Sequence, residues 1–423
     1  MKRRIWIAVV SVIALTLIAG ISLVGCAKKE TGPVTLSVWA RDLTDGTADH
    51  AYVTALVKDF QVKYPTITLD YVAYGEGLND KLKTAMSAGS GLPDVFQSWG
   101  GSLMGNFADA GLLLDLTGEL KAVPGSAAAQ AAMTWKNKIY GVAPFFAICG
   151  VFINEGIFEA NGLKPATTVD ELAKNADALL AKGIQPFAAG GKDKWPVLHL
   201  YMYLVDRFGG PNAFPDAVAR KIRFDSDVFV KAGLFYQAWV KKGYFGSKPL
   251  GEAYGDAQQL MATGKAGMHV TGSWMCAQYS SAEFTKEKIG FYGFPEMTGG
   301  VGPATDVMGM TDIGFAATKQ AAAKKDAVVK FMTFAMSPDA GAAEPGRVAA
   351  IPGVKATNPI TTQASEVFGK AKVVQFWWDQ NLPAAATTPI NDVVQIFFLP
   401  NGDVKKALTD FDKLMDEVVG PVK

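Results

Sequence analysis

Behind its N-terminal segment, the chain alternates between strand-like and helix-like patterns. Residues 34–39 are predicted to form a strand, and residues 51–64 place apolar side chains at helical spacing. Residues 67–74 are β-branched and aromatic, and a helix over 79–88 and a short strand over 94–97 follow. Because helical crossovers bring successive strands side by side in one direction, this order predicts an α/β fold with a parallel sheet.

Ligands of such sheets bind beyond the carboxyl ends of the strands. The loops after Trp39, Tyr74 and Gln97 are therefore candidates for the site. The side chains in these loops that we expect to bind ligand are Arg41, Asp42, Glu76, Asn79, Ser98 and Trp99. For the polar ones the alternative is a solvated loop position. For Trp99 the alternative is core packing, although a core tryptophan seldom precedes two glycines at a strand exit.

The rest of the chain continues the alternation. Residues 139–154 end in a long apolar run, which predicts a strand buried on both faces or crossing between two domains. A capping box over Thr168–Glu171 opens a helix that runs to residue 181. Further predicted elements are helix 228–242 capped by Asp225, Ser226 and Asp227, strands 265–271 and 313–317, helix 324–335, a helix from Ser337 and Pro338, and an amphipathic helix 403–419. With 423 residues and no flexible linker, we expect two domains joined by ordered crossing segments.

The sequence lacks the motifs of several common catalytic and metal-binding sites. The three histidines have no zinc-ligand spacing, and neither a GxSxG elbow nor a phosphate-binding loop occurs. The chain carries 41 basic and 40 acidic residues, and removing Lys2, Arg3 and Arg4 leaves 38 basic residues. A near-neutral chain lacks the excess of positive charge that is typical of proteins that bind nucleic acid. We therefore expect neither enzyme activity nor a metal, a cofactor or a nucleic-acid partner.

The N-terminus has a basic start followed by an apolar stretch over residues 5–17. Leu23-Val24-Gly25-Cys26 then resembles the lipobox of bacterial lipoproteins, in which the cysteine thiol takes a diacylglycerol before cleavage. This pattern predicts a signal peptide over 1–25, lipidation of Cys26 and a polar tether over 26–33. A permanent signal-anchor helix is the alternative. The expected location is outside the cytoplasm, anchored to the membrane by lipid, with the envelope type left open.

Two further cysteines, Cys149 and Cys276, lie in apolar surroundings. Outside the cytoplasm they could form a disulfide. Their surroundings favour free buried thiols, which behave as small hydrophobic residues.

Several blocks occur in the order found in one known family. They are Phe60–Pro65, Met86–Val95, Ala108–Leu116, Tyr140–Leu172 and Gly264–Trp274. Together they resemble the extracellular solute-binding proteins of ABC importers, in the sugar-binding class that includes maltose-binding protein. Departures are Ile153-Asn154-Glu155, where the family often has Tyr-Asn-Lys, and a proline displaced by one position to Pro144.

The resemblance implies an α/β fold of two lobes, the type II-like periplasmic-binding-protein or Venus-flytrap fold, with the ligand cleft between the lobes. The first lobe would comprise 34–148 plus 310–351, and the second 149–309 plus 352–423. The lobes would close like a hinge around ligand, and the closed form would engage the membrane subunits of the permease.

The resemblance and the sequence add further site residues. Trp274 follows strand 265–271, where the similar family residue stacks on ligand, and Asp312 lies near the second crossing. Of the adjacent Trp377 and Trp378, we expect Trp378 to face the cleft together with Asp379, and Phe145 to shape the wall beside the hinge. Trp195 could rim the cleft.

The expected function is capture of a sugar or oligosaccharide by a monomeric lipoprotein and its delivery to the permease. Other cargoes stay open, namely a polyol, a glycerol phosphate or an amino compound. A surface adhesin, a sensor and a carbohydrate hydrolase are the alternatives from other classes.

Overall fold

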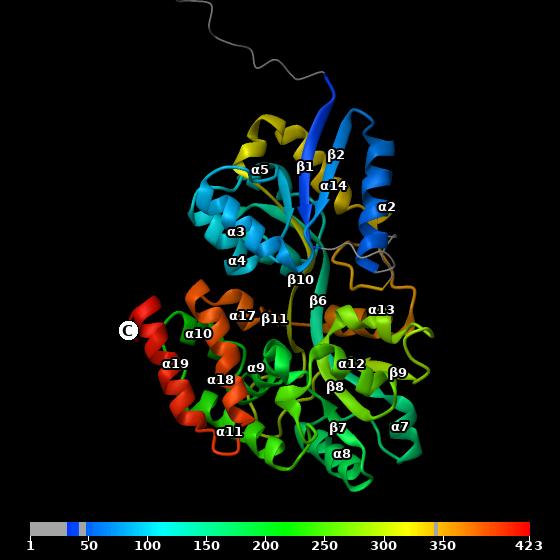
Figure 1. The fold of residues 1–423 in the computed structure, drawn as a ribbon, viewed down its shortest axis with the longest axis vertical. Coiled ribbons are helices and arrows are strands. Elements are labelled where there is room, and N and C mark those ends of the chain that lie inside the picture. Colours follow the sequence, from blue (N-terminus) through cyan, green and yellow to red (C-terminus); the bar gives the residue numbers. More distant parts are fainter. Residues whose placement is uncertain (1–31, 42–47, 342–345) are drawn as a thin grey trace, which may run out of the picture. The chain divides into compact units, whose positions relative to one another are not determined.

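The strands form a large mixed sheet and a small hairpin in the computed structural model, which describes residues 32–41, 48–341 and 346–423 (Figure 1). The described strands are β1 (Val34–Ala40), β2 (Ile67–Ala73), β3 (Val95–Gln97), β4 (Thr134–Trp135), β5 (Lys138–Ile139), β6 (Gly141–Asn154), β7 (Gln185–Ala188), β8 (Ala266–Gly272), β9 (Ile289–Tyr292), β10 (Asp306–Ala317) and β11 (Val373–Gln375). The large sheet has the order β2-β1-β3-β10-β6-β8-β7, with β11 beside β10 and β9 beside β6. The hairpin pairs β4 with β5.

Helices surround this sheet along most of the chain. They are α2 (Ala48–Lys63), α3 (Leu78–Ala88), α4 (Gly101–Asp109), α5 (Thr117–Leu120), α6 (Ala127–Ala132), α7 (Glu155–Ala160), α8 (Val169–Ala181), α9 (Trp195–Gly209), α10 (Ala213–Val218), α11 (Asp227–Lys241), α12 (Tyr254–Ala262), α13 (Cys276–Tyr279), α14 (Lys325–Ala335), α15 (Pro338–Gly341), α16 (Pro359–Lys370), α17 (Trp378–Asn381), α18 (Thr387–Phe397) and α19 (Val404–Val418). None of the helices in the described part of the chain is long and apolar enough to cross a membrane.

The long strand β6 connects two groups of strands. Its first half pairs antiparallel with β10 up to Ile148, and from Cys149 onward it pairs with β8 and then β9. β10 also has different partners at its two ends, β11 at its start and β3 at its finish. Every residue of β6 is buried, so the prediction of a strand buried on both faces is confirmed.

The local predictions agree with the structure at several places. β1 and β3 run parallel, as their helical connections predict. Thr168 caps α8, and the capping box with Glu171 is present. One cap differs: Ser226 is the N-cap of α11 but makes no side-chain capping bond. The adjacent Asp225 instead accepts hydrogen bonds from Arg223 and from Thr409, and the second of these ties it to α19.

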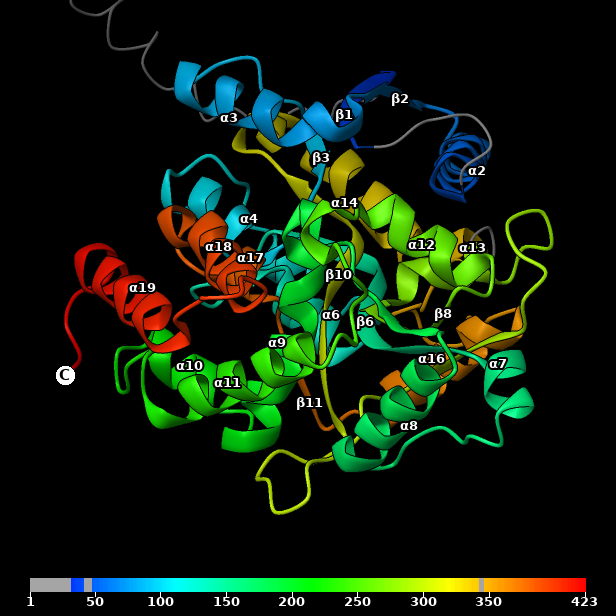
Figure 2. The ribbon, with the colours of Figure 1, turned by 60° about the horizontal axis from the view of Figure 1, so that its bottom comes forward.

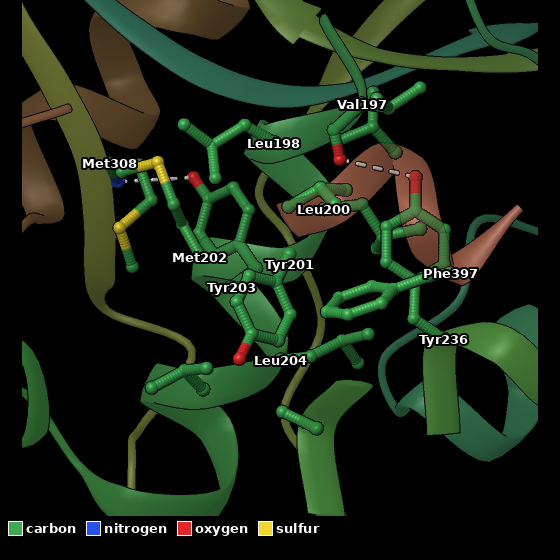
Figure 3. Packing of buried hydrophobic residues seen from close by; sticks show 14 of the residues in the cluster. Val197, Leu198, Leu200, Tyr201, Met202, Tyr203, Leu204, Tyr236, Met308 and Phe397 are labelled. Carbon is green, nitrogen blue, oxygen red and sulfur yellow. Dashed lines mark hydrogen bonds between the residues drawn. The ribbon is translucent and has the colours of Figure 1, made fainter. Parts of the chain in front are cut away.

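The helix α9 is buried along most of its length in the larger hydrophobic core (Figure 3). The hydroxyl of Tyr203 donates to the backbone oxygen of Cys149 on β6, at 2.6 Å, and accepts from the backbone nitrogen of Met308 on β10, at 3.3 Å. Tyr236 of α11 donates to the backbone oxygen of Val197, at 3.1 Å. These bonds satisfy buried polar groups; those of Tyr203 join α9 to β6 and β10, and that of Tyr236 joins α9 to α11.

Cys149 and Cys276 are free and buried. Burial raises the pKa of both thiols, so both stay protonated at neutral pH. Cys26 and the whole predicted signal segment lie outside the described residues.

Candidate functional site

A cavity of about 1500 Å³ lies where β6 and β10 connect the two groups of strands. Its lining comes from the loops after β1 and β3, from β10, from the start of α9 and α12, and from the segments after β8 and β11. Of the site residues predicted from the sequence, the structure brings six together in this cavity: Arg41, Asn79, Trp99, Trp274, Asp312 and Asp379.

On one wall, Arg41 and Trp99 lie together. The Arg41 guanidinium carbon is 5.9 Å from the centre of the Trp99 ring, within range of a cation–π contact. The chain turns sharply after Trp99, because Gly100 and Gly101 have φ angles of 76° and 57°. A side chain at Gly100 would collide with the backbone of Ala132. The two glycines thus permit the turn that presents Trp99 to the cavity.

On the opposite wall, aromatic residues form a connected group. Trp274 follows β8, and its indole nitrogen donates to the Tyr254 hydroxyl at 2.6 Å. The same hydroxyl lies 3.0 Å from the Thr271 hydroxyl. Trp195 packs on this pair, with its ring centre 4.6 Å from that of Tyr254 and 5.8 Å from that of Trp274. Burial raises the pKa of Tyr254 to about 12, so the hydroxyl stays protonated and available for both bonds.

Trp377 and His199 extend the aromatic wall. The Trp377 ring centre is 5.3 Å from that of Trp274 and 5.8 Å from that of His199. Both Trp377 and His199 line the cavity but are only 4% exposed. Burial lowers the pKa of His199 to about 3, so its imidazole is neutral at physiological pH.

At the crossing strands, Asp312 occupies an irregularity in the pairing of β10 with β6 between Thr311 and Ile313. Such bulges redirect a side chain out of the regular alternation. Asp312 forms an ion pair with Arg347, and both residues line the cavity. Nearby in the lining, burial raises the pKa of Asp379 to about 6, opposed by a hydrogen bond from Asn391.

The charged side chains of the lining are mostly acidic. Among the described lining residues, four are acidic (Asp193, Glu283, Asp312 and Asp379) and two are basic (Arg41 and Arg347). This balance disfavours an anionic ligand and is compatible with a neutral or cationic one. No group of three or more histidine, cysteine, aspartate or glutamate side chains within the described ranges is placed to hold a metal ion.

Three predicted site residues lie away from the cavity. Trp378 is fully buried, stacks on Phe214 with ring centres 4.5 Å apart, and donates its indole N–H to Gln375. The prediction for this tryptophan pair was therefore wrong, since Trp377 lines the cavity and Trp378 fills the core.

Phe145 is also fully buried, edge-on to Tyr52 with ring centres 4.9 Å apart. Ser98 is 5% exposed, and its hydroxyl accepts from the backbone nitrogen of Gly100 at 3.1 Å. Ser98 therefore supports the turn behind Trp99 instead of lining the cavity. Asp42 lies outside the described residues, as does the side chain of Glu76.

Sequence reasoning missed part of the lining. His199 and Tyr254 belong to helical segments whose patterns indicate ordinary packing, and no local signal marks them. Arg347 follows a segment without a clear pattern and meets Asp312 only through the tertiary fold. Trp195, predicted as a possible rim residue in a loop, is the first residue of α9 and lines the cavity.

Comparisons with known proteins agree on the fold. A protein of Pyrococcus horikoshii, named as an uncharacterized ABC transporter extracellular-binding protein, is 27% identical over 251 residues, which cover 57% of this chain and 56% of the relative. The alignment thus spans little more than half of that relative. A chitin oligosaccharide binding protein of known structure has a TM-score of 0.80 at 24% identity, covering 91% of this chain and 98% of its own.

A second solved structure comes from work on xylan utilization by Caldanaerobius polysaccharolyticus. It has a TM-score of 0.79 at 24% identity and covers 90% of this chain and 100% of its own. These likenesses show a shared two-lobed α/β fold. The chitin oligosaccharide neighbour is named as a binding protein. The model of the bacterial extracellular solute-binding protein family matches residues 44–342, more than half of the chain, and the chain therefore belongs to that family.

Proposed function

We propose that this protein captures a neutral sugar or oligosaccharide outside the cytoplasm and delivers it to the permease of an ABC importer. The observation that carries the proposal is the cavity, in which Trp99 on one wall and Trp274 on the other accompany carboxylate, amide and guanidinium groups. A sugar offers C–H faces that pack on aromatic rings and hydroxyls that pair with such polar groups.

The size and charge of the cavity support this class of cargo. A volume of about 1500 Å³ exceeds that of most small-molecule pockets, which favours an oligosaccharide over a single sugar unit. The excess of acidic lining residues weighs against a glycerol phosphate. The same excess fits a cargo with an amino group, which is the second candidate. One of the structural neighbours is named for binding a chitin oligosaccharide.

The delivery step would depend on two lobes that close around the solute. We propose lobes of 34–148 plus 310–351 and of 149–309 plus 352–423. The change in the partners of β6 between Ile148 and Cys149 supports the first boundary. Because closure would be driven by contacts with both lobes, a solute between Trp99 and Trp274 suits this mechanism.

We further propose that the mature protein is a monomer held to the membrane by a lipid on Cys26, after removal of residues 1–25. The lipobox-like Leu23-Val24-Gly25-Cys26 supports this proposal. Metabolic labelling with a radioactive fatty acid tests it, with Cys26→Ser as the control that should lose the label.

Thermal-shift and calorimetric titrations test the cargo. The panel contains galactose, maltose, raffinose, xylobiose and chitobiose as neutral saccharides, glycerol 3-phosphate as an anion, and glucosamine and arginine as amino compounds. We expect at least one neutral saccharide to bind and raise the melting temperature, because a ligand of the folded state stabilises it by mass action. We expect Trp274→Ala to weaken that binding by about tenfold or more, and to lower the unliganded melting temperature as well, because the ring also packs on Trp195 and Trp377. Binding of only the anion, or of no saccharide, would contradict the proposal.

A further inference from the structure

Several polar atoms in the cavity wall are buried without a hydrogen-bond partner. Among the described residues these atoms include His199 Nδ1, Thr311 Oγ1, Trp377 Nε1 and Gln380 Oε1, and all four residues line the cavity. A buried polar group without a partner costs about 1–3 kcal/mol, so native proteins retain few of them, and each calls for an explanation. These atoms have almost no accessible surface in this structure, so a ligand can reach them only when the side chains around the cavity shift on binding. Their gathering at one cavity suggests that a ligand supplies their partners in this way.

The polar atoms of Trp377, Gln380 and His199 belong to neighbouring residues. The backbone nitrogen of Gln380 donates to the backbone oxygen of Trp377 at 3.1 Å, in the first turn of α17. His199 faces the Trp377 ring from α9, with ring centres 5.8 Å apart. α17 lies beside α4, where the Ser102 hydroxyl is 2.8 Å from the backbone oxygens of Gln380 and Leu382 (Figure 2). The backbone of α17 is thus anchored at α4, while the Trp377 ring contacts α9.

The chemistry of these atoms matches hydroxyl groups. The indole nitrogen of Trp377 can only donate a hydrogen bond, and the amide end of Gln380 can donate and accept. The neutral His199 imidazole offers one donor and one acceptor nitrogen. A sugar hydroxyl both donates and accepts, so adjacent hydroxyls can satisfy such a mixed set. A carboxylate or a fully ionised phosphate only accepts and cannot do so.

We propose that His199, Trp377 and Gln380 form a subsite that recognises adjacent hydroxyls of one sugar unit. The subsite rests on the proposed function and specifies which residues select the saccharide. The rings of Trp274 and Trp195 contact those of Trp377 and His199, so the sugar unit would pack against aromatic rings while its hydroxyls meet the polar atoms.

Adjacent tryptophans provide a matched pair of variants. The indole N–H of Trp377 lacks a partner at the cavity, whereas that of Trp378 donates to Gln375 at 2.8 Å in the core. Trp377→Phe should weaken binding of the tightest-binding neutral saccharide among galactose, maltose, raffinose, xylobiose and chitobiose by about fivefold to twentyfold. The unliganded melting temperature should stay unchanged or rise, because the variant removes an unsatisfied buried donor. Trp378→Phe should show the reverse pattern, a lower melting temperature with unchanged affinity.

Gln380→Met separates hydrogen bonding from ring packing, since it leaves every aromatic ring in place. We expect an affinity loss of about fivefold by calorimetry with the same saccharide, again without loss of unliganded stability. If the wild-type protein binds a saccharide and both Trp377→Phe and Gln380→Met bind it equally well, the subsite is refuted while the proposed function stands. If the wild-type protein binds none of the five saccharides, the proposed function fails, and the subsite fails with it. A lower unliganded melting temperature in both variants, with unchanged affinity, would assign these residues a structural role instead.

Discussion

The indole N–H of Trp274 in the cavity wall donates to the hydroxyl group of Tyr254. This hydroxyl accepts from Trp274 at 2.6 Å and lies 3.0 Å from Thr271 on β8. Tyr254→Phe would leave the indole N–H without its acceptor, so we expect the saccharide affinity to fall about fivefold and the unfolding free energy by about 1 kcal/mol. Calorimetry and urea unfolding measure the two effects.

Tyr201→Phe is the matched control, because the Tyr201 hydroxyl donates to the backbone oxygen of Phe229 in the core at 3.0 Å. This variant should lose stability with unchanged affinity. Equal affinity of wild-type protein and Tyr254→Phe would show that Tyr254 does not position Trp274 for binding.

At the residue scale, sequence reasoning found the cavity residues that follow strand ends. Trp99 and Trp274 each follow the end of a strand and have glycine or serine as a neighbour. Ligands of α/β sheets bind beyond the carboxyl ends of strands, so these positions were good candidates. The choice between Trp377 and Trp378 could not be made from sequence, because adjacent residues at the start of a short helix face different directions. Their different burial arises from packing against Phe214 and Trp274, which are distant in sequence.

At the scale of elements, α9 and β10 meet through a buried group of charges. Arg207 forms an ion pair with Asp206, and it donates to the backbone oxygen of Asp306 at 3.1 Å. Burial raises the pKa of Asp206 to about 6, with Arg207 opposing the shift and Asp306 adding to it. Asp206 is only 1% exposed, so water does not screen these charges.

This pKa predicts a pH-dependent contribution to stability. Since the folded-state pKa of Asp206 lies above the unfolded value of about 3.9, its contribution is complete below about pH 4 and is lost as the pH rises through about 6. The unfolding free energy of the wild-type protein minus that of Asp206→Asn should therefore decrease from pH 4 to pH 7, by on the order of 3 kcal/mol. Urea unfolding across this range measures the difference, and a constant difference would contradict the prediction.

The helices and strands themselves were largely predictable, because the periodicity of hydrophobic residues and the capping residues of helices are local properties of the sequence. The capping box at Thr168 and the buried strand over 141–154 are examples. The antiparallel pairing of β10 with β6, and the bulge that places Asp312 at the cavity, were not predictable. Pairing direction depends on how distant segments meet, and a bulge leaves no periodic signature.

At the scale of the whole molecule, the cavity exists only because the chain passes between two groups of strands. Arg41 and Trp99 come from one group, and Trp274 and Tyr254 come from the other. A solute that contacts both groups would couple its binding energy to their relative movement. The family membership of the chain and its two-lobed fold agree with this arrangement.

A crystal structure with the tightest-binding saccharide of the panel would locate the ligand. We predict electron density for a sugar unit packed on Trp274, with hydroxyls within hydrogen-bond distance of His199, Trp377 and Gln380, and with the saccharide also in contact with Trp99. Density for the saccharide elsewhere on the protein, or a cavity filled only by water at saturating saccharide, would contradict the assignment of this cavity as the sugar-binding site.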